Sequence, residues 1–250
     1  ICALQYTGGT TGASKGVKLT QTSLLSNIAQ ALEVISVGED SLKYSTAIAP
    51  LPLYHIYAYS LCFGMLPAIR GHSILIPDPR NIPLFVKAIR KFKFDIFCGL
   101  NSLFVALLQD KDFKRLDFSG LKMTLSGGMA LMTSVAEDWQ KITGCVVSEG
   151  YGMTESSPVI SMNPSGFEKI GTAGIPISGT EIKVIDDQGV EQPVGGVGEL
   201  CIKGAQVMAG YWKQPEQTAE VIINDWLHTG DIVTVDEEGY ITIVDRLKDM

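Results

Sequence analysis

The sequence is short of basic residues, and this shortage restricts its partners. Its 250 residues contain 20 Lys and Arg against 27 Asp and Glu, which gives a formal net charge of −7. A chain with a pI near 5.0 is poorly suited to binding nucleic acid or an acidic membrane surface. We therefore expect small molecules, and not nucleic acid, as the main partners.

Paired cysteines and long apolar runs are also lacking. The five cysteines are scattered, with no C-x-x-C pair, which indicates a reducing compartment, buried thiols and no metal cluster. The most apolar run, residues 57–69, is too short to span a bilayer and is interpreted as a buried helix. We expect no signal peptide. The start at Ile1 in mid-strand and the abrupt end at LKDM predict a piece of a longer protein.

The most informative segment present is YTGGTTGASKG, which follows an apolar, strand-like run. It combines four glycines, three threonines, a serine and Lys15. Glycines let backbone N–H groups approach a phosphate, hydroxyls add donors, and the lysine adds positive charge. The segment therefore predicts a loop that binds a nucleotide triphosphate.

Other motifs fit this loop less well. A Walker A loop needs Gly-Lys-Ser/Thr, whereas Lys15 lies between Ser14 and Gly16. Residues 12–16 match the G-x-S-x-G of a hydrolase elbow, but that elbow needs its serine directly after a strand and before a helix. A hydrolase with Ser14 as nucleophile and a purely structural hairpin stay open as alternatives.

Two regions differ in the order of their predicted elements. In residues 1–165, strands at 2–6, 17–20, 45–49, 73–76, 95–98, 121–125 and 145–149 alternate with helices at 21–35, 57–69, 83–92, 102–109 and 133–143. In residues 166–244, turns separate strands at 180–186, 198–203, 232–236 and 240–244, with one helix at 215–223. The predicted fold class is α/β, a helix-covered and largely parallel sheet followed by a smaller β-rich, barrel-like subdomain. Thr133 is the expected N-cap of its helix and Gly144 the residue that ends it.

The segment EGYGMTES follows a strand end, where ligands of open α/β sheets bind. Gly150 and Gly152 flank Tyr151, whose ring is then free to lie against a base. Thr154 and Glu155 offer oxygen ligands suited to Mg²⁺ on phosphates. A tight turn with a solvated glutamate is the alternative interpretation.

Three further segments carry single polar candidates. In WLHTGD, Asp231 is suited to accept hydrogen bonds from ribose hydroxyls, or is an ordinary turn aspartate. In VDRLKDM, Arg246 would add a donor to ribose or phosphate. In LPLYHIYA, His55 is more simply a satisfied core residue than a catalyst. His72 and His228 carry no separate signal, and no His/Cys cluster has metal-ligand spacing.

Together with GELCIKGAQVMAGYW, these motifs resemble, in their order, the AMP-forming acyl-activating family. That family includes acyl-CoA synthetases, firefly luciferase and peptide-synthetase adenylation domains. The spacing of these motifs and the residues around them look closest to those of bacterial long-chain fatty acid–CoA ligases. The chain departs from the family at Gly8, where many members have serine, and at Ala13-Ser14, where many have x-Pro; both changes keep the loop polar.

The resemblance implies a set of site residues. The catalytic residues would be Thr154, Glu155 and His55, with Glu155 as the metal ligand and Lys248 at a hinge, residues 245–250, to a C-terminal domain. Acyl-binding residues would be Tyr54, His55, Tyr57, Gly127 and Gly150. ATP would be bound by Thr7, Gly8, Gly9, Thr10, Thr11, Gly12, Lys15, Gly128, Tyr151, Gly152, Thr154, Asp231 and Arg246.

The resemblance also implies a reaction. A fatty acid would be activated by ATP to an acyl-adenylate and then to acyl-CoA, with Mg²⁺ as cofactor and CoA as co-substrate. Because carboxylate and triphosphate repel each other, catalysis would consist of positioning and cationic stabilisation. The family's catalytic lysine lies in its C-terminal domain, so we expect this piece to be inactive alone.

Two alternative functions stay open: an enzyme that uses another acid, such as an aryl acid, or a carrier-protein acceptor, and a non-catalytic nucleotide-binding module. The expected location is the cytoplasm. Peripheral association of the parent protein with the inner face of the membrane is the alternative.

Overall fold

The computed structural model describes residues 1–7, 14–35 and 42–246. Contacts divide the chain into two interleaved units. The first comprises Ile1–Val34, Tyr151–Asn163 and Thr172–Met250, and the second comprises Ile35–Gly150 and Pro164–Gly171. The predicted subdomains, 1–165 and 166–244, follow the sequence instead of these contacts, and their boundary stays a prediction.

The second unit is built on parallel strands. Their order is β4 (His72–Leu75), β3 (Thr46–Ala49), β5 (Ile96–Gly99), β6 (Met123–Gly127) and β7 (Val147–Gly152), and every pairing among them is parallel. All of β5 and most of β6 are buried. Such continuous burial is typical of parallel strands that are covered on both faces.

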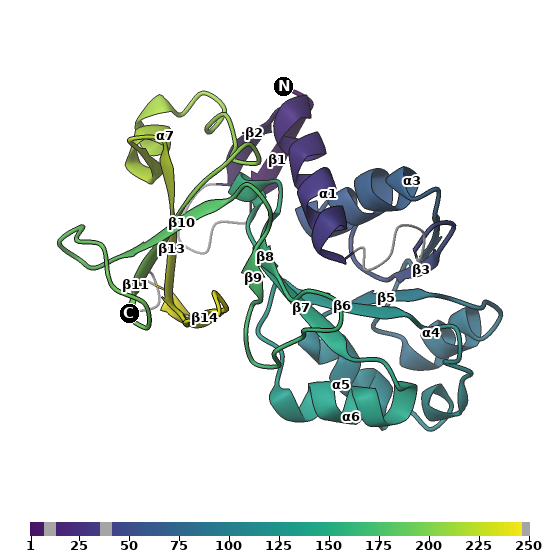
Figure 1. Cartoon of the computed structure of the whole chain (residues 1–250). Helices are drawn as coiled ribbons and strands as arrows, with labels where there is room; N and C mark the ends of the chain where they lie inside the picture. The colour runs from purple at the N-terminus through teal and green to yellow at the C-terminus, as the bar shows by residue number, and fades with distance from the viewer. Residues whose placement is uncertain (8–13, 36–41, 247–250) are drawn as a thin grey trace. The chain divides into compact units, whose positions relative to one another are not determined.

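Helices cover this sheet on both sides (Figure 1). On one side lie α4 (Ile82–Ile89), α5 (Asn101–Gln109), the short 3₁₀ helix Phe113–Arg115 and α6 (Thr133–Thr143). On the other lie α2 (Ile56–Ser60), the π-helix Leu61–Met65 and α3 (Leu66–Ala68). The residues predicted as one helix, 57–69, thus form three consecutive helical pieces.

An aromatic cluster forms the core between the sheet and α4–α6. The Phe97 ring centroid lies 5.0 Å from that of Trp139 and 6.1 Å from those of Phe85 and Phe104. The Trp139 indole N–H donates to Thr124 Oγ1 at 3.0 Å. The indole N–H of this buried ring therefore has a hydrogen-bond partner, so its burial does not leave an unsatisfied donor in the core.

The first unit begins with a hairpin. β1 (Ala3–Thr7) and β2 (Lys15–Leu19) pair antiparallel and lead into α1 (Gln21–Ile35). The α1 side chain of Asn27 exchanges two hydrogen bonds with the backbone of Val159, at 2.7 and 3.0 Å. This pair ties α1 to the small antiparallel pair β8 (Val159–Met162) and β9 (Ile175–Pro176).

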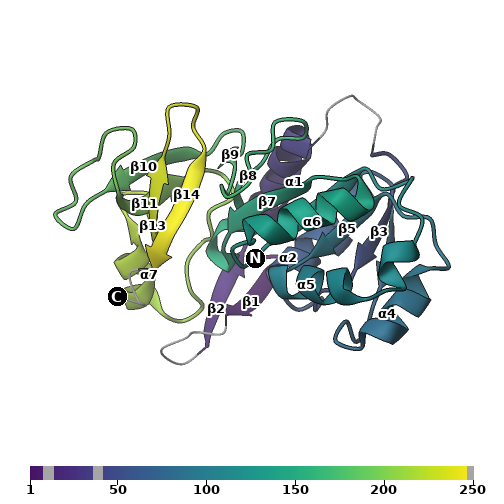
Figure 2. The same cartoon turned by 90° about the horizontal axis from the view of Figure 1, so that it is seen from below.

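A separate antiparallel sheet completes the first unit, and Figure 2 shows its strands β13 and β14 side by side. Its order is β10 (Glu181–Ile185), β11 (Gly198–Lys203), β13 (Trp226–Val235) and β12 (Ile222–Ile223), and β14 (Ile241–Arg246) also pairs with β13. The helix α7 (Pro215–Val221) precedes β12.

The predicted fold class is confirmed, because a helix-flanked and mostly parallel sheet is accompanied by a separate antiparallel one. Details differ. Thr133 is the first residue of α6, and Met132 is its N-cap, whereas Gly144 ends the helix at φ 74° as expected. The strand predicted at 232–236 is the second half of β13. Within the described ranges, no helix has the length and apolar character that a bilayer crossing requires.

Candidate functional site

The neck of the predicted phosphate loop is well defined. Thr7 and Lys15 are paired residues of β1 and β2, and the Ser14 hydroxyl donates to the Thr7 carbonyl oxygen at 2.8 Å. The loop residues Gly8, Gly9, Thr10, Thr11 and Gly12 lie outside the described residues. Because a strand and not a helix follows Ser14, the nucleophile-elbow alternative is wrong.

Glu155 lies in a short 3₁₀ turn, Thr154–Ser156, just after β7. Its side chain is buried, and its Oε1 accepts a hydrogen bond of 2.8 Å from the Tyr211 hydroxyl. Its carbonyl oxygen accepts from the Met208 N–H at 2.8 Å. Burial, followed by the nearby Glu155 charge, raises the pKa of Tyr211. The phenol therefore stays a donor to the carboxylate.

Tyr211 also contacts the hairpin neck. The Lys15 ammonium lies 4.8 Å from the centroid of the Tyr211 ring, in cation–π contact. The backbone beside Tyr211 pairs with β2, since Trp212 N–H donates to the Gly16 carbonyl at 2.7 Å. One tyrosine thus connects the predicted phosphate-binding lysine with the predicted metal-binding glutamate. Sequence reasoning missed Tyr211, although it is the last residue but one of the quoted motif GELCIKGAQVMAGYW.

The predicted adenine and ribose residues also meet. The Tyr151 hydroxyl donates to Asp231 Oδ2 at 2.5 Å, and both side chains are buried, with exposed fractions of 8% and 5%. Asp231 is paired across β13 and β14 with Arg246. The structure therefore brings Tyr151, Asp231 and the backbone of Arg246 to one end of the antiparallel sheet.

A β-bulge places Asp231. Cys201 of β11 pairs with His228, but Glu199 pairs with Ile232, so one residue of β11 is opposite three residues of β13, 229–231. The Thr229 hydroxyl donates to the Leu200 carbonyl at 2.8 Å and accepts from the Asp231 N–H at 3.1 Å. Bulges of this kind redirect a side chain out of the regular alternation of a strand.

Gly152 is required by a close backbone approach. A Cβ atom at this position would lie 1.9 Å from the Pro158 carbonyl oxygen. The same oxygen accepts a hydrogen bond of 3.0 Å from the Met153 N–H. The chain between Gly152 and Pro158 therefore folds back closely on itself, and this return fixes the turn that carries Thr154 and Glu155.

The predicted acyl-binding residues lie in the second unit. Gly127 and Gly150 are paired across β6 and β7, and a Cβ atom on Gly127 would lie 3.5 Å from the Tyr57 ring. The Tyr57 hydroxyl donates to the Leu125 carbonyl at 3.2 Å. Tyr57, Gly127 and Gly150 are thus neighbours, and Gly128 follows directly at φ 79°.

His55 is not a core residue, which corrects its simplest interpretation. It is exposed and caps the N-terminus of α2, where its Nδ1 accepts from the Tyr57 N–H at 3.3 Å. Partial burial lowers its pKa, which favours the neutral ring that this acceptor role needs. Tyr54 beside it is 78% exposed.

A second carboxylate, Glu149, has a structural place within the second unit. Its two oxygens accept hydrogen bonds from the backbone N–H groups of Leu131, at 3.2 Å, and Gly171, at 3.3 Å. Burial raises its pKa, and these two bonds act in the opposite direction. It holds the segment near Gly171 against the β6–α6 connection.

The predicted site residues therefore divide between the two units. The first unit contains the described nucleotide candidates Thr7, Lys15, Tyr151, Gly152, Thr154, Glu155, Asp231 and Arg246. The second contains Gly128 and the acyl candidates Tyr54, His55, Tyr57, Gly127 and Gly150. Lys248 lies outside the described residues. Their roles in binding and catalysis stay predictions.

The donor set around Glu155 fits Mg²⁺. A buried carboxylate and the neighbouring Thr154 hydroxyl supply hard oxygen ligands from a single turn. Magnesium in proteins commonly uses one or two carboxylates and takes its other ligands from water and substrate phosphates. Glu155 would therefore hold the ion if phosphates bind beside it.

Known proteins resemble this chain over its whole length. The AMP-binding enzyme family profile matches residues 1–212. Long-chain-fatty-acid–CoA ligases of Escherichia coli O6:H1 and Haemophilus influenzae are each 46% identical, over 100% of this chain and 45% of their own length. The crystal structure of the anthranilate CoA ligase AuaEII with anthranoyl-AMP has a TM-score of 0.90 at 28% identity, over 100% of this chain and 48% of that one. The chain thus spans less than half the length of these relatives.

Proposed function

This chain belongs to the AMP-binding enzyme family, and we propose that it forms the nucleotide- and acyl-binding part of a long-chain fatty acid–CoA ligase. The reaction is ATP-dependent activation of a fatty acid to an acyl-adenylate, followed by transfer to CoA. The choice of acid is supported by 46% identity to two ligases of that name. The observation that carries the proposal is the buried connection from Lys15 through Tyr211 to Glu155.

The nucleotide is bound by the first unit. Lys15 and the hairpin neck meet the terminal phosphates, and the Tyr151 ring meets the base. Asp231 accepts hydrogen bonds from the ribose. The hydrogen bond that the Tyr151 hydroxyl donates to its carboxylate holds that group in place. A carboxylate has two oxygens with about four acceptor positions, so it can accept hydrogen bonds from more than one hydroxyl.

Charge decides the chemistry. The fatty carboxylate attacks the α-phosphorus in line, the bond to the β-phosphate oxygen breaks, and pyrophosphate leaves with the electron pair. Both reactants are anionic, so Lys15 at the phosphates lowers their repulsion. Bound Mg²⁺, held by Glu155, would neutralise phosphate charge. In the second step the CoA thiol attacks the acyl carbon and displaces AMP.

The acyl chain is assigned to the second unit. Tyr57, Gly127 and Gly150 are neighbours there, and the absence of a Cβ atom on Gly127 lets the Tyr57 ring and the Gly150 carbonyl approach closely. Residues 1–165 would carry acyl binding and most of the nucleotide-binding residues, and residues 166–244 would form the β-rich part, which contributes Asp231. Five free cysteines, four of them buried, support a reducing location such as the cytoplasm.

A chimera tests this function. The segment of the E. coli relative that matches this chain is replaced by these 250 residues, and pyrophosphate release is measured with oleate, ATP and Mg²⁺. We expect oleate-dependent release followed by oleoyl-CoA formation. Glu155→Gln should lower the rate about a hundredfold, while Glu137→Gln, on the exposed face of α6, should leave it unchanged.

Binding by the 250-residue chain itself gives an independent result. Titration calorimetry should show Mg²⁺–ATP binding that Tyr151→Ala and Asp231→Asn weaken, with Glu137→Gln as the control. A chimera that activates only aryl acids would favour the other enzymatic function, for which the likeness to an anthranilate CoA ligase is the supporting observation. A chimera that releases no pyrophosphate, although the 250-residue chain binds Mg²⁺–ATP, would favour a non-catalytic binding module, whereas full activity in the Glu155→Gln chimera would remove the proposed role of Glu155.

A further inference from the structure

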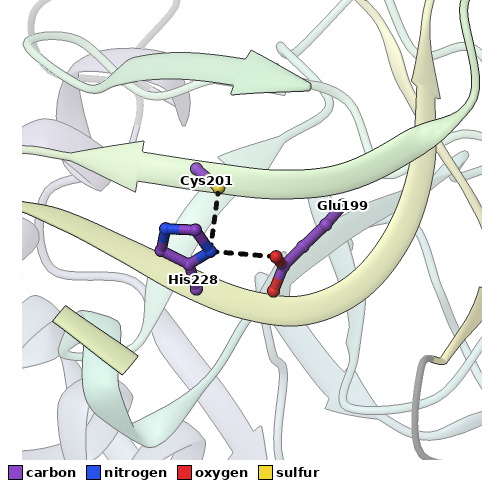
Figure 3. Close-up of side chains that lie close together, drawn as sticks. All are labelled: Glu199, Cys201 and His228. Atoms are coloured by element: carbon purple, nitrogen blue, oxygen red, sulfur yellow. Dashed lines mark hydrogen bonds and ion pairs between the residues drawn. The ribbon is translucent and has the colours of Figure 1, made fainter. Parts of the chain in front are cut away.

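Three metal-ligating side chains converge on the antiparallel sheet of the first unit, apart from the proposed nucleotide site. Glu199 and Cys201 are two residues apart on β11, and His228 is the cross-strand partner of Cys201 on β13. Figure 3 shows the three side chains pointing toward one another from these two strands. One ligand atom from each lies within 4.8 Å of the other two.

The distances approach those of a tetrahedral ion. His228 Nδ1 lies 3.5 Å from Cys201 Sγ and 2.9 Å from Glu199 Oε2. Bonds of about 2.3 Å to sulfur and about 2.05 Å to nitrogen and oxygen require edges of about 3.5 and 3.3 Å. The sulfur–nitrogen edge already has this length. The nitrogen–oxygen edge is shorter because a proton now joins its two atoms.

The carboxylate is oriented from outside the cluster. Glu199 Oε1 accepts a hydrogen bond of 2.9 Å from the Gly230 N–H, so Oε2 is directed at His228. Hydrogen bonds of this kind to a ligand's second atom fix the geometry of metal sites in proteins. The Gly230 N–H belongs to the β-bulge, which therefore contributes both Asp231 and the support for this cluster.

We propose that Glu199, Cys201 and His228 bind a thiophilic divalent cation of the Zn²⁺ class, with water as the fourth ligand. Thiolate, imidazole and carboxylate together suit Zn²⁺ or Co²⁺ and are softer than the all-oxygen ligands expected for Mg²⁺ at Glu155. A thiolate and a carboxylate also balance the two positive charges of the ion. This site does not depend on the proposed ligase function.

Burial explains why the site is inert without an ion. Cys201 is fully buried, and this burial, together with the Glu199 charge, raises the pKa of its thiol to about 12. The thiol is therefore protonated at neutral pH and a weak nucleophile. A bound cation would stabilise the thiolate directly, and the thiol proton would be released to solvent. The proton between His228 Nδ1 and Glu199 Oε2 would also leave Nδ1 to solvent, and the neutral ring would carry its N–H on Nε2. The imidazole and the carboxylate, each partly accessible, provide the entry side.

Cobalt spectroscopy tests the proposal on the 250-residue chain. Cys2 is exposed, so Cys2→Ala serves as the background and removes adventitious thiolate binding. Anaerobic titration with Co²⁺ should give one equivalent of a near-ultraviolet thiolate-to-cobalt band with visible d–d bands, which Zn²⁺ abolishes. Cys201→Ala should lose the band, and His228→Gln and Glu199→Gln should weaken binding about tenfold or more.

Matched controls separate this cluster from general thiol and imidazole binding. Cys145→Ala, at another buried cysteine, and His72→Gln, at an exposed histidine, should leave the titration unchanged. The absence of a saturable band in the Cys2→Ala protein, or a band that persists in Cys201→Ala, would overturn the proposal. X-ray absorption of the zinc-loaded Cys2→Ala protein identifies the ligand atoms directly, so it does not depend on whether the variants in the cluster fold. One sulfur ligand supports the site, and a shell without sulfur rejects it.

Discussion

Phe97 and Glu155 occupy comparable positions in the two units, since each is a buried side chain within or just after a strand, but different forces hold them. Phe97 lies among aromatic rings in the second unit. Glu155 in the first unit is held by a phenol whose ring in turn contacts a lysine. Apolar packing gains free energy in proportion to buried area. Burial of a carboxylate costs free energy, which hydrogen bonds offset only in part.

This difference agrees with the proposed place of the nucleotide site in the first unit. A fold gains little from buried charges that apolar side chains could replace. The core of the second unit around Phe97 is apolar, with Glu149 as a partly buried carboxylate outside it. The first unit encloses the polar side chains of Tyr151, Glu155 and Asp231. Perturbed or buried polar groups of this kind concentrate at functional sites. Four substitutions, taken from the largest expected effect to the smallest, sharpen or break this contrast.

Trp139→Ala should have the largest effect. It removes a fully buried ring and leaves the Thr124 hydroxyl without its donor, so the free energy of unfolding should fall by about 3–5 kcal/mol. Urea denaturation followed by circular dichroism measures this. Phe92→Ala, at a ring that is 45% exposed, should cost at most about 1 kcal/mol. Equal losses in both variants would show that the aromatic cluster does not dominate the second unit.

Gly152→Ala should come next, because its Cβ atom would collide with the Pro158 carbonyl oxygen. A loss of about 2–4 kcal/mol in the free energy of unfolding is expected. Gly120→Ala is the matched control, since its Cβ atom would meet only the Phe94 carbonyl at 3.4 Å. If Gly152→Ala were as mild as its control, the close return of the chain would not be what positions Glu155.

Tyr211→Phe isolates the hydroxyl that Glu155 accepts. The ring and its contact with Lys15 are kept, but a buried carboxylate loses a donor, which should cost about 1–3 kcal/mol of stability. Tyr44→Phe is the control, because its hydroxyl only meets exposed Arg70. Thermal unfolding in the presence and absence of Mg²⁺–ATP should show a larger gap between the two variants without ligand. An unchanged midpoint in Tyr211→Phe would remove the proposed connection.

The smallest expected effect concerns pH. Partial burial lowers the pKa of His55 below its ordinary value of 6.5, so the unfolded chain takes up the proton first as the pH falls. The stability that neutral His55 contributes is therefore complete above the pKa of the unfolded chain. It is lost as the pH falls through the lower pKa of the folded protein. It should be about 0.5 kcal/mol, since the ring is exposed and its role is an N-cap. His55→Asn keeps the cap without titrating. The difference between wild type and variant should therefore change between about pH 7.5 and pH 5.

Local patterns predicted much of the fold. The helix predicted over residues 133–143 agrees with α6, because its apolar spacing and the glycine that ends it are local signals that do not depend on tertiary contacts. The first predicted strands fall within a residue or two of β1 and β2. The strand β13 was only half predicted. Its first half, WLHTGD, is polar and turn-like, and pairing with β11 and β12 makes it extended.

The site was predicted less completely, for the same physical reason. Motifs identified Tyr151, Glu155 and Asp231, and the structure shows that Tyr151 and Asp231 touch. Tyr211 and the cluster around Cys201 depend on strand register, which sequence spacing does not reveal. Glu199 and Cys201 share a strand, but His228 reaches them only because the bulge sets its pairing.

That irregularity also has an evolutionary consequence. Three consecutive residues of β13 absorb the mismatch between β11 and β13, so the ladder between these two strands is in regular register on either side of them. Substitutions in the regular parts of β11 and β13 can exchange one β-branched side chain for another without moving the Asp231 carboxylate. Loss of a single residue from 229–231 would instead rotate every following side chain of β13 to the opposite face. We therefore expect relatives to keep the length of this short stretch constant, even where the side chains outside the two proposed sites differ.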